Sequence, residues 1–227
     1  MGFNVAIDGP AGSGKSTVAR KAAEKLHFLY VDTGAMYRAI GLCMHREGLD
    51  LEDEAAVSEH IGDAHIDIRY DEEGQQRVLL NGEDVTPVIR DEKVGAMASA
   101  VSRYPAVRNH LTSLQRELAA ENDVFMDGRD IGTCILPDAG LKIYLTADPS
   151  VRAERRVGEL AQKGIAADFE KIREEIIARD WQDMHRETAP LKQAEDAVKI
   201  DTSSMTIQEV TDRVVALTRE RMAGKAQ

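Results

Sequence analysis

The chain has 227 residues, enough for one sizeable α/β core with a small insert. Its 29 basic and 40 acidic residues give a formal net charge of −11, which argues against general binding of a nucleic-acid polymer or an anionic membrane. Cys43 and Cys134 have no C-x-x-C spacing, and no apolar stretch approaches the ~20 residues of a membrane span, so we expect a cytoplasmic protein.

A glycine-rich loop is the first motif along the chain. It lies between an apolar run at residues 3–7, typical of a buried strand, and a helical sequence at 17–26. Residues 9–16, GPAGSGKS, fit the P-loop pattern G-x-x-x-x-G-K-[ST]. Backbone N–H groups of such a loop wrap phosphate oxygens, Lys15 reaches the β- and γ-phosphates, and the Ser16 hydroxyl ligates Mg²⁺. The sequence therefore predicts a nucleoside triphosphate site made by Gly9, Pro10, Ala11, Gly12, Ser13, Gly14, Lys15, Ser16 and Thr17.

Five apolar runs are predicted to form core strands. They cover residues 3–7, 28–31, 123–126, 141–145 and 197–200. Helical stretches separate them, which favours a parallel sheet with helices on both faces. Residues 65–86 depart from this pattern, because they read as short strands and contain Asn81-Gly82, a two-residue hairpin signal. We expect a five-stranded parallel α/β fold with a small antiparallel insert between the second and third core strands.

Charged residues follow two of these predicted strands. Residues 32–38, DTGAMYR, follow the second strand, and residues 127–130, DGRD, follow the third. Because ligands of open α/β sheets bind beyond the carboxyl ends of the strands, we expect these charges in the nucleotide crevice. A solvated loop-end position is the alternative for Arg38 or Arg129 taken alone.

Two later helices carry further basic groups. In the helix near residues 168–186, an apolar stripe of Phe169, Ile172 and Ile176 continues as Arg179, Asp183 and Arg186. We expect that face to begin as core and to end as a charged row, although an exposed ion pair on the last turn accounts for the row equally well. Arg152, Arg155 and Arg156 lie on the helix after Asp148, where a solvated face is also an equal alternative. Three basic groups in an acidic protein suggest a site for more than one phosphate-bearing molecule.

P-loop proteins include switches and motors as well as kinases. A GTPase switch needs an N-K-x-D motif after a late strand, and this sequence has none. The D-x-x-G match at residues 71–74 lies in the polar turn of the predicted hairpin. A small-molecule kinase, which needs an acceptor pocket and mobile arginines, is therefore the favoured class.

Five segments, in order along nearly the whole chain, resemble the bacterial cytidylate kinases of the nucleoside monophosphate kinase family. They are IDGPAGSGKST at 7–17, DTGAMYR at 32–38, NGEDVT at 81–86, DGRDIGT at 127–133 and RDWQDMHRETAPL at 179–191. Adenylate kinases match less well, because the D-G-F-P-R type segment is absent. Ala189 stands where the family commonly has serine, and Cys134 and Leu136 replace more usual residues, all conservative departures.

The resemblance implies transfer of the γ-phosphoryl group of ATP to CMP or dCMP, with Mg²⁺. It assigns the acceptor site to Thr33, Tyr37, Arg38, Ser99, Arg108, Arg129, Asp130, Arg179 and Asp183. Within that set Asp130 would accept a hydrogen bond from the cytosine amino group and repel the carbonyl oxygen of uracil. Lys15, Arg129, Arg179 and Arg186 would stabilise the transferring group, and Arg155 would reach ATP from a lid.

The resemblance also implies a division of the chain. Residues 1–63 and 104–227 would form the kinase core, with a lid at about 152–168, and residues 64–103 the acceptor-binding insert. We expect a monomer, because no long exposed apolar stripe is evident. A kinase preferring UMP or another small acceptor is the main alternative, and a nucleotide-dependent regulatory protein is a weaker one.

Overall fold

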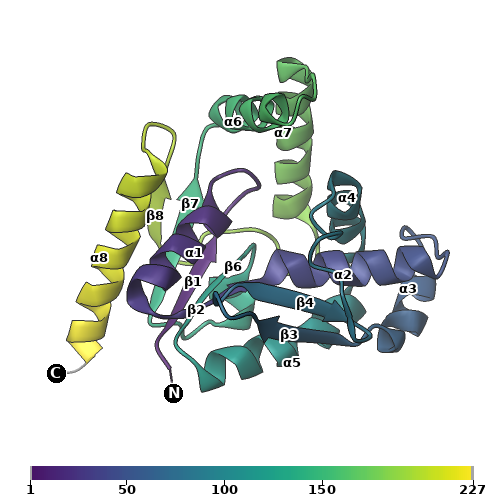
Figure 1. The fold of residues 1–227 in the computed structure, drawn as a ribbon, viewed down its shortest axis with the longest axis horizontal. Helices are drawn as coiled ribbons and strands as arrows, with labels where there is room; N and C mark the ends of the chain where they lie inside the picture. The colour runs from purple at the N-terminus through teal and green to yellow at the C-terminus, as the bar shows by residue number, and fades with distance from the viewer. Residues whose placement is uncertain (1, 226–227) are drawn as a thin grey trace.

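The computed structural model describes residues 2–225, and a parallel sheet of five strands forms its centre (Figure 1). The strands are β1 (Asn4–Asp8), β2 (Leu29–Asp32), β6 (Val124–Gly128), β7 (Leu141–Thr146) and β8 (Val198–Asp201). They lie in the order β2-β6-β1-β7-β8, and every neighbouring pair is parallel. The predicted strands and the parallel α/β class are confirmed.

Side chains alternate along each strand and build a separate core on each face of the sheet. Val5 and Ile7 belong to the core beneath α1 (Lys15–Leu26) and α8 (Ile207–Lys225). Ala6, between them, belongs to the core beneath α2 (Thr33–Arg46) and α5 (Pro105–Glu121). Figure 1 shows α1 and α8 side by side, and both follow strands of the main sheet.

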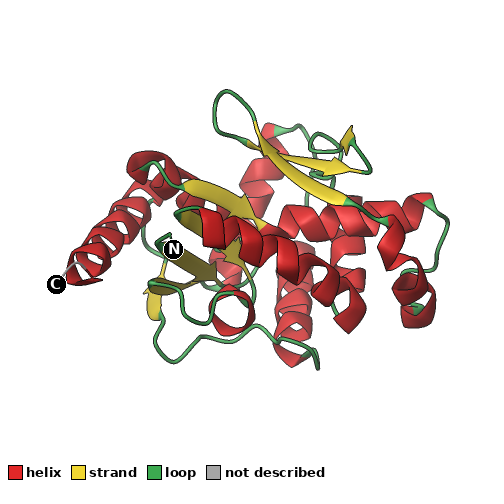
Figure 2. Cartoon of the chain, turned by 90° about the horizontal axis from the view of Figure 1, so that it is seen from below, coloured by secondary structure: helices red, strands yellow, loops and turns green. Residues whose placement is uncertain are grey.

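The predicted antiparallel insert is present as a second, three-stranded sheet. Its strands are β3 (Ile66–Tyr70), β4 (Gln76–Leu80) and β5 (Glu83–Asp84), in the order β3-β4-β5. Asn81 and Gly82 have φ angles of 51° and 86° and turn the chain between β4 and β5, as their sequence predicts. The segments α3 (Glu54–His60) and a 3₁₀ turn (Ile61–Asp63) precede this sheet, and α4 (Glu92–Val101) follows it. Figure 2 shows the small sheet set apart from the parallel one.

Two helices, α6 (Pro149–Gln162) and α7 (Phe169–His185), pack on each other and project beyond the main sheet (Figure 1). Asp148 caps α6 by accepting a hydrogen bond from the Ser150 N–H at 2.8 Å. The expectation that the α7 stripe begins as core is wrong: Phe169, Ile172 and Ile176 are only half-buried. The reason is that α7 packs on α6 rather than lying across the sheet. In residues 2–225, none of the helices has the length and apolarity needed to cross a bilayer.

Candidate active site

Three carboxylates meet at the carboxyl edge of the sheet. Asp32 at the end of β2 is in register with Asp127 in β6, and Asp8 at the end of β1 is in register with Gly128. Because the strands are parallel, all three side chains are carried to the same edge, where the P-loop also begins. This edge is the expected nucleotide crevice.

The P-loop packs tightly against the neighbouring strand. Gly9 has a φ of +149°, and a Cβ atom there would lie 1.9 Å from the carbonyl oxygen of Leu145, so only glycine fits. Lys15 is 5 % exposed, and its Nζ donates to the Pro10 carbonyl at 2.7 Å. Burial, with the nearby charge of Arg129, lowers the pKa of Lys15 to about 7. The charged form of this buried amine is thus poorly solvated, and a bound anion would stabilise it.

Asp127 binds two hydroxyl groups. It accepts a hydrogen bond from Ser16 Oγ at 2.8 Å and another from the Tyr30 hydroxyl at 2.9 Å. Burial, with the nearby carboxylate of Asp32, raises the pKa of Asp127 to about 6. The sequence predicted a charge at the crevice here but gave no role to Asp127 or Tyr30. Position after a buried strand was the only signal for Asp127.

Asp8 anchors the segment that follows the DGRD motif. Its two carboxylate oxygens accept hydrogen bonds from the N–H groups of Ile131 and Gly132, both at 2.7 Å. These residues begin a π-helical turn, Ile131–Ile135, which the sequence did not predict. Burial raises the pKa of Asp8 to about 6 despite those two hydrogen bonds. The anchor fixes the backbone next to Arg129 and Asp130.

An ion pair links the end of β6 to α7. Arg129 Nε donates to Asp183 Oδ2 at 2.8 Å, and Asp183 is 8 % exposed. Arg179 lies one turn earlier on α7, and its buried Nε has no hydrogen-bond partner among the described residues. Burial and the nearby Arg129 lower the pKa of Arg179. An unpaired buried donor close to the cation of Arg129 indicates a site for an anion or a polar ligand.

Asp130 lies between two arginines. It is 4 % exposed, and its carboxylate pairs with Arg108 on one oxygen and with Arg186 Nη2 at 3.3 Å on the other. Arg108 also lies over the ring of Tyr37, with its guanidinium carbon 5.6 Å from the ring centroid. Burial raises the pKa of Tyr37 to about 12, so its hydroxyl stays neutral.

One cavity of about 190 Å³ brings the predicted acceptor residues together. Its lining includes all nine of them, namely Thr33, Tyr37, Arg38, Ser99, Arg108, Arg129, Asp130, Arg179 and Asp183. Ala11, Gly12, Lys15, Ser16 and Arg186 complete the predicted residues at this cavity. The P-loop, the end of β2, α2, α4, α5, the end of β6 and α7 therefore meet at one place.

The other predicted donor residues lie behind or beside this cavity. Gly9, Pro10, Ser13 and Gly14 form the body of the P-loop, and Thr17 lines a neighbouring groove. Arg155 donates to the Thr202 carbonyl at 2.6 Å, and the Thr202 hydroxyl donates to the Ser13 carbonyl at 3.3 Å. Arg155 thus lies close to the P-loop but outside the cavity that holds the predicted acceptor residues.

Arg152 and Arg156 have different roles although they are close in sequence. Arg152 is 2 % exposed and pairs with Asp180 through two nitrogens, one of them at 3.0 Å, while donating to the Ala11 carbonyl at 2.9 Å. It therefore joins α6, α7 and the P-loop. Arg156 pairs with Glu92 at 3.0 Å on the surface, which agrees with the solvated alternative for that residue.

Sequence comparison gives whole-length matches. A family model described as Cytidylate kinase matches residues 5–220. The chain is 47 % identical over 222 residues to the cytidylate kinase of Anoxybacillus flavithermus, covering 98 % of each chain. It is 48 % identical over 219 residues to that of Shouchella clausii, covering 96 % of this chain and 97 % of the relative. It is 46 % identical over 222 residues to the cytidylate kinase of Thermotoga maritima, covering 98 % of this chain and 99 % of the relative.

Structural comparison gives more distant matches that bear on the fold alone. A gluconokinase from Sinorhizobium meliloti superposes with a TM-score of 0.51 at 14 % identity, covering 99 % of this chain and 98 % of that one. An uncharacterized protein from Eubacterium ventriosum superposes with a TM-score of 0.52 at 13 % identity, covering 97 % and 99 %. The architecture is therefore shared with proteins of very different sequence.

Proposed function

The chain belongs to the cytidylate kinase family, and we propose that it transfers the γ-phosphoryl group of ATP to CMP or dCMP, giving ADP and the nucleoside diphosphate. The observation that carries this proposal is the convergence of Lys15, Arg38, Arg129, Arg179 and Arg186 on one cavity. In a chain with a formal net charge of −11, such a cationic cavity is suited to two phosphate-bearing molecules.

The donor side of the proposal rests on the P-loop. Its backbone and Lys15 would hold the β- and γ-phosphates of ATP, at the N-terminus of α1. Arg155, held against the loop after β8, would reach ATP from the lid. The buried position of Lys15 excludes water around its ammonium group and so strengthens its interaction with phosphate.

The acceptor side of the proposal rests on the cavity residues that lie outside the P-loop. Arg38 and Arg129 would bind the acceptor phosphate, and Arg179 and Asp183 the sugar hydroxyls. Asp130 would accept a hydrogen bond from the cytosine amino group. Although both its oxygens are paired with arginines, each carboxylate oxygen has two lone pairs and retains room for a further donor.

The residues present fit Mg²⁺ as part of the donor complex. Ser16 and Asp127 place a hydroxyl and a buried carboxylate 2.8 Å apart beside Lys15. The raised pKa of Asp127 reflects a carboxylate that lacks solvation and that a cation would stabilise. Mg²⁺ is usually held by one or two protein oxygens together with substrate phosphates and water, so no larger ligand cluster is needed. When bound, it would neutralise charge on the phosphate oxygens.

Phosphoryl transfer requires positioning and charge stabilisation rather than a strong base. The acceptor phosphate has a second pKa near ~6 and is already largely anionic at neutral pH. Lys15, Arg129, Arg179 and Arg186 would stabilise negative charge that spreads over the transferring group. Closure of the insert and of α6 with α7 would exclude water and suppress hydrolysis of ATP.

A coupled assay of ADP release tests the proposal directly. MgATP is supplied with CMP, dCMP, UMP, AMP or GMP as the acceptor. We expect strong turnover with CMP and dCMP and little with the others. Turnover led by UMP would favour the alternative pyrimidine kinase, and ADP release without any acceptor would favour an ATPase or a nucleotide-dependent regulatory protein.

A further inference from the structure

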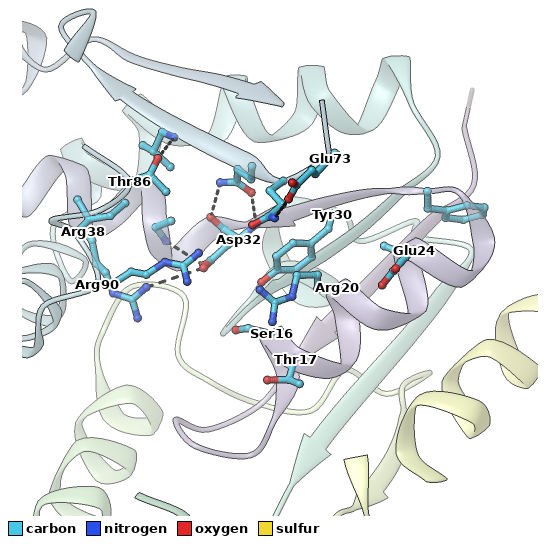
Figure 3. Close-up of a pocket in the computed structure, with 18 of the residues that line it drawn as sticks. Ser16, Thr17, Arg20, Glu24, Tyr30, Asp32, Arg38, Glu73, Thr86 and Arg90 are labelled. Carbon is cyan, nitrogen blue, oxygen red and sulfur yellow. Dashed lines mark hydrogen bonds and ion pairs between the residues drawn. The ribbon is translucent and has the colours of Figure 1, made fainter. Parts of the chain in front are cut away.

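A groove of about 840 Å³ lies between α1, the edge strand β2 and the antiparallel insert (Figure 3). It is continuous with the acceptor cavity, because Ser16, Asp32 and Arg38 line both. The groove therefore opens directly onto the place where the acceptor phosphate is proposed to bind.

Hydrogen bonds hold the two walls of this groove together. Gln76 in β4 accepts from the Asp32 N–H at 2.7 Å and donates to the Asp32 carbonyl at 3.2 Å. The Tyr70 hydroxyl of β3 donates to the Tyr30 carbonyl at 3.1 Å. These bonds occupy the exposed edge of β2 and attach the insert to it, so the groove is a formed part of the fold.

Charge is unevenly distributed along the groove. Figure 3 shows Arg38 and Arg90 together at one end, whereas Glu24 and Glu73 lie toward the other. Arg38 comes no closer than 4.0 Å to the carboxylate of Asp32. Within residues 2–225, no carboxylate forms an ion pair with Arg90. Two guanidinium groups that line one groove, one with a carboxylate only at 4.0 Å and the other with no carboxylate partner among residues 2–225, are suited to binding an anion.

Other arginines of the insert have partners. Arg69 pairs with Asp67 at 3.1 Å, and Arg77 pairs with Asp71 at 2.9 Å. An acidic protein thus supplies carboxylates to these arginines while leaving Arg90 to face the groove. The difference sets Arg90 apart from the ordinary charged surface of the insert.

The backbone at Arg90 is held in place on both sides. The preceding Ile89 is 2 % exposed, and its N–H donates to the Val85 carbonyl at 3.0 Å. The following Asp91 caps α4 by accepting from the Lys93 N–H at 2.8 Å. Arg90 therefore has a fixed point of attachment, while its exposed side chain is free to turn toward a ligand.

We propose that Arg90 is a further ligand of the acceptor phosphate and that, with Arg38, it forms a phosphate subsite where the groove meets the acceptor cavity. The subsite takes the dianion of a phosphate monoester, the group that a nucleoside monophosphate carries. Two guanidinium forks bind such a group more tightly than one, and Arg38 is shared with the cavity in which transfer occurs. This role rests on the proposed function and extends the acceptor site onto the insert.

Calorimetric binding of CMP and of cytidine tests this role, because the two ligands differ only by the phosphate. The proteins compared are the unaltered chain, Arg90→Ala, Arg90→Lys and, as a matched loss of one positive charge from the insert, Arg69→Ala. We expect Arg90→Ala to weaken CMP binding about tenfold or more while cytidine binding is unchanged. Arg90→Lys should recover part of the loss, and Arg69→Ala should bind both ligands like the unaltered chain.

Two other results would overturn the proposed role of Arg90 and leave the proposed function standing. One is CMP binding by Arg90→Ala equal to that of Arg69→Ala. The other is an equal loss of CMP and cytidine binding, which would mean that Arg90 maintains the shape of the insert instead of contacting phosphate. Failure of the unaltered chain to bind CMP would instead overturn the proposed function, and the role of Arg90 with it.

Discussion

Arg129 and Asp183 form an ion pair that joins the end of β6 to α7, with Nε and Oδ2 2.8 Å apart. Burial by itself would raise the pKa of Asp183, but the charge and hydrogen bond of Arg129 outweigh it and hold that pKa below its ordinary value. The carboxylate therefore stays ionised and keeps Arg129 directed into the cavity. Because the pair joins a strand end to a helix that projects from the sheet, it also couples the position of α7 to the proposed phosphate site.

Arg129→Ala removes a cation that we expect to stabilise the transferring group. The loss should cost about 2–4 kcal/mol of transition-state stabilisation, as for other charge-stabilising donors. The measurement is kcat/KM for CMP at saturating MgATP. An unchanged value would show that Arg129 does not belong to the acceptor site.

Lys15→Ala removes the P-loop ammonium group. We expect turnover to fall about a hundredfold to a thousandfold, because no other side chain can replace this charge at the β- and γ-phosphates. Lys25→Ala is the control, since Lys25 lies on the same helix but pairs with Asp212 on the surface. If both variants lose activity equally, the effect comes from the helix and not from phosphate binding.

Asp130→Asn tests whether residue 130 distinguishes cytosine from uracil. The asparagine amide can donate to the carbonyl oxygen of uracil, whereas the carboxylate can only accept. We expect the ratio of kcat/KM for CMP to that for UMP to narrow by about tenfold. Asp67→Asn, an exposed change on the insert, should leave the ratio as it is. A ratio unaltered in Asp130→Asn would refute the assignment of Asp130 to base recognition.

Asp180→Ala leaves the buried guanidinium of Arg152 without its carboxylate. We expect the free energy of unfolding to fall by about 3–5 kcal/mol, the usual effect of breaking a buried pair. The double variant Arg152→Met/Asp180→Ala should be more stable than Asp180→Ala, because it no longer buries an uncompensated charge. Urea denaturation of Asp180→Ala, Arg152→Met and the double variant measures their free energies of unfolding. If the loss in the double variant equals the sum of the losses in the two single variants, the buried-pair explanation is contradicted.

Asp8 should contribute a specific pH dependence to stability. Its pKa is about 6 in the folded protein against 3.8 ordinarily, so the folded state holds this proton more tightly than the unfolded state. The stabilising contribution of Asp8 to the free energy of unfolding is fully present below pH 3.8 and is lost as the pH rises through about 6. The difference in unfolding free energy between the unaltered chain and Asp8→Asn should therefore fall between about pH 4 and 6, by at most about 1.4 kcal/mol per pH unit. A difference independent of pH would contradict the raised pKa.

Local patterns in the sequence were enough to predict most of the architecture. Apolar runs marked the five core strands, the P-loop pattern marked the triphosphate site, and Asn81-Gly82 marked the turn of the insert. Each of these signals spans only a few residues, because strand burial, loop conformation and turn type depend on neighbouring positions. The resemblance also predicted a set of acceptor residues that the fold brings to one cavity.

The tertiary structure alone decided which distant side chains meet. Asp127 binds Ser16 and Tyr30 across separations of 111 and 97 residues, and no local pattern encodes such pairs. The same holds for Arg152, for which the sequence left a solvated face and a basic group of a phosphate site as equal alternatives, and which is buried against Asp180 and the P-loop. The prediction for Phe169 was wrong in the opposite sense, because it was expected in the core and is only half-buried. Helical periodicity shows that a face is apolar but not what packs against it. Burial and pairing depend on how whole elements pack, which is a property of the folded chain and not of any one segment.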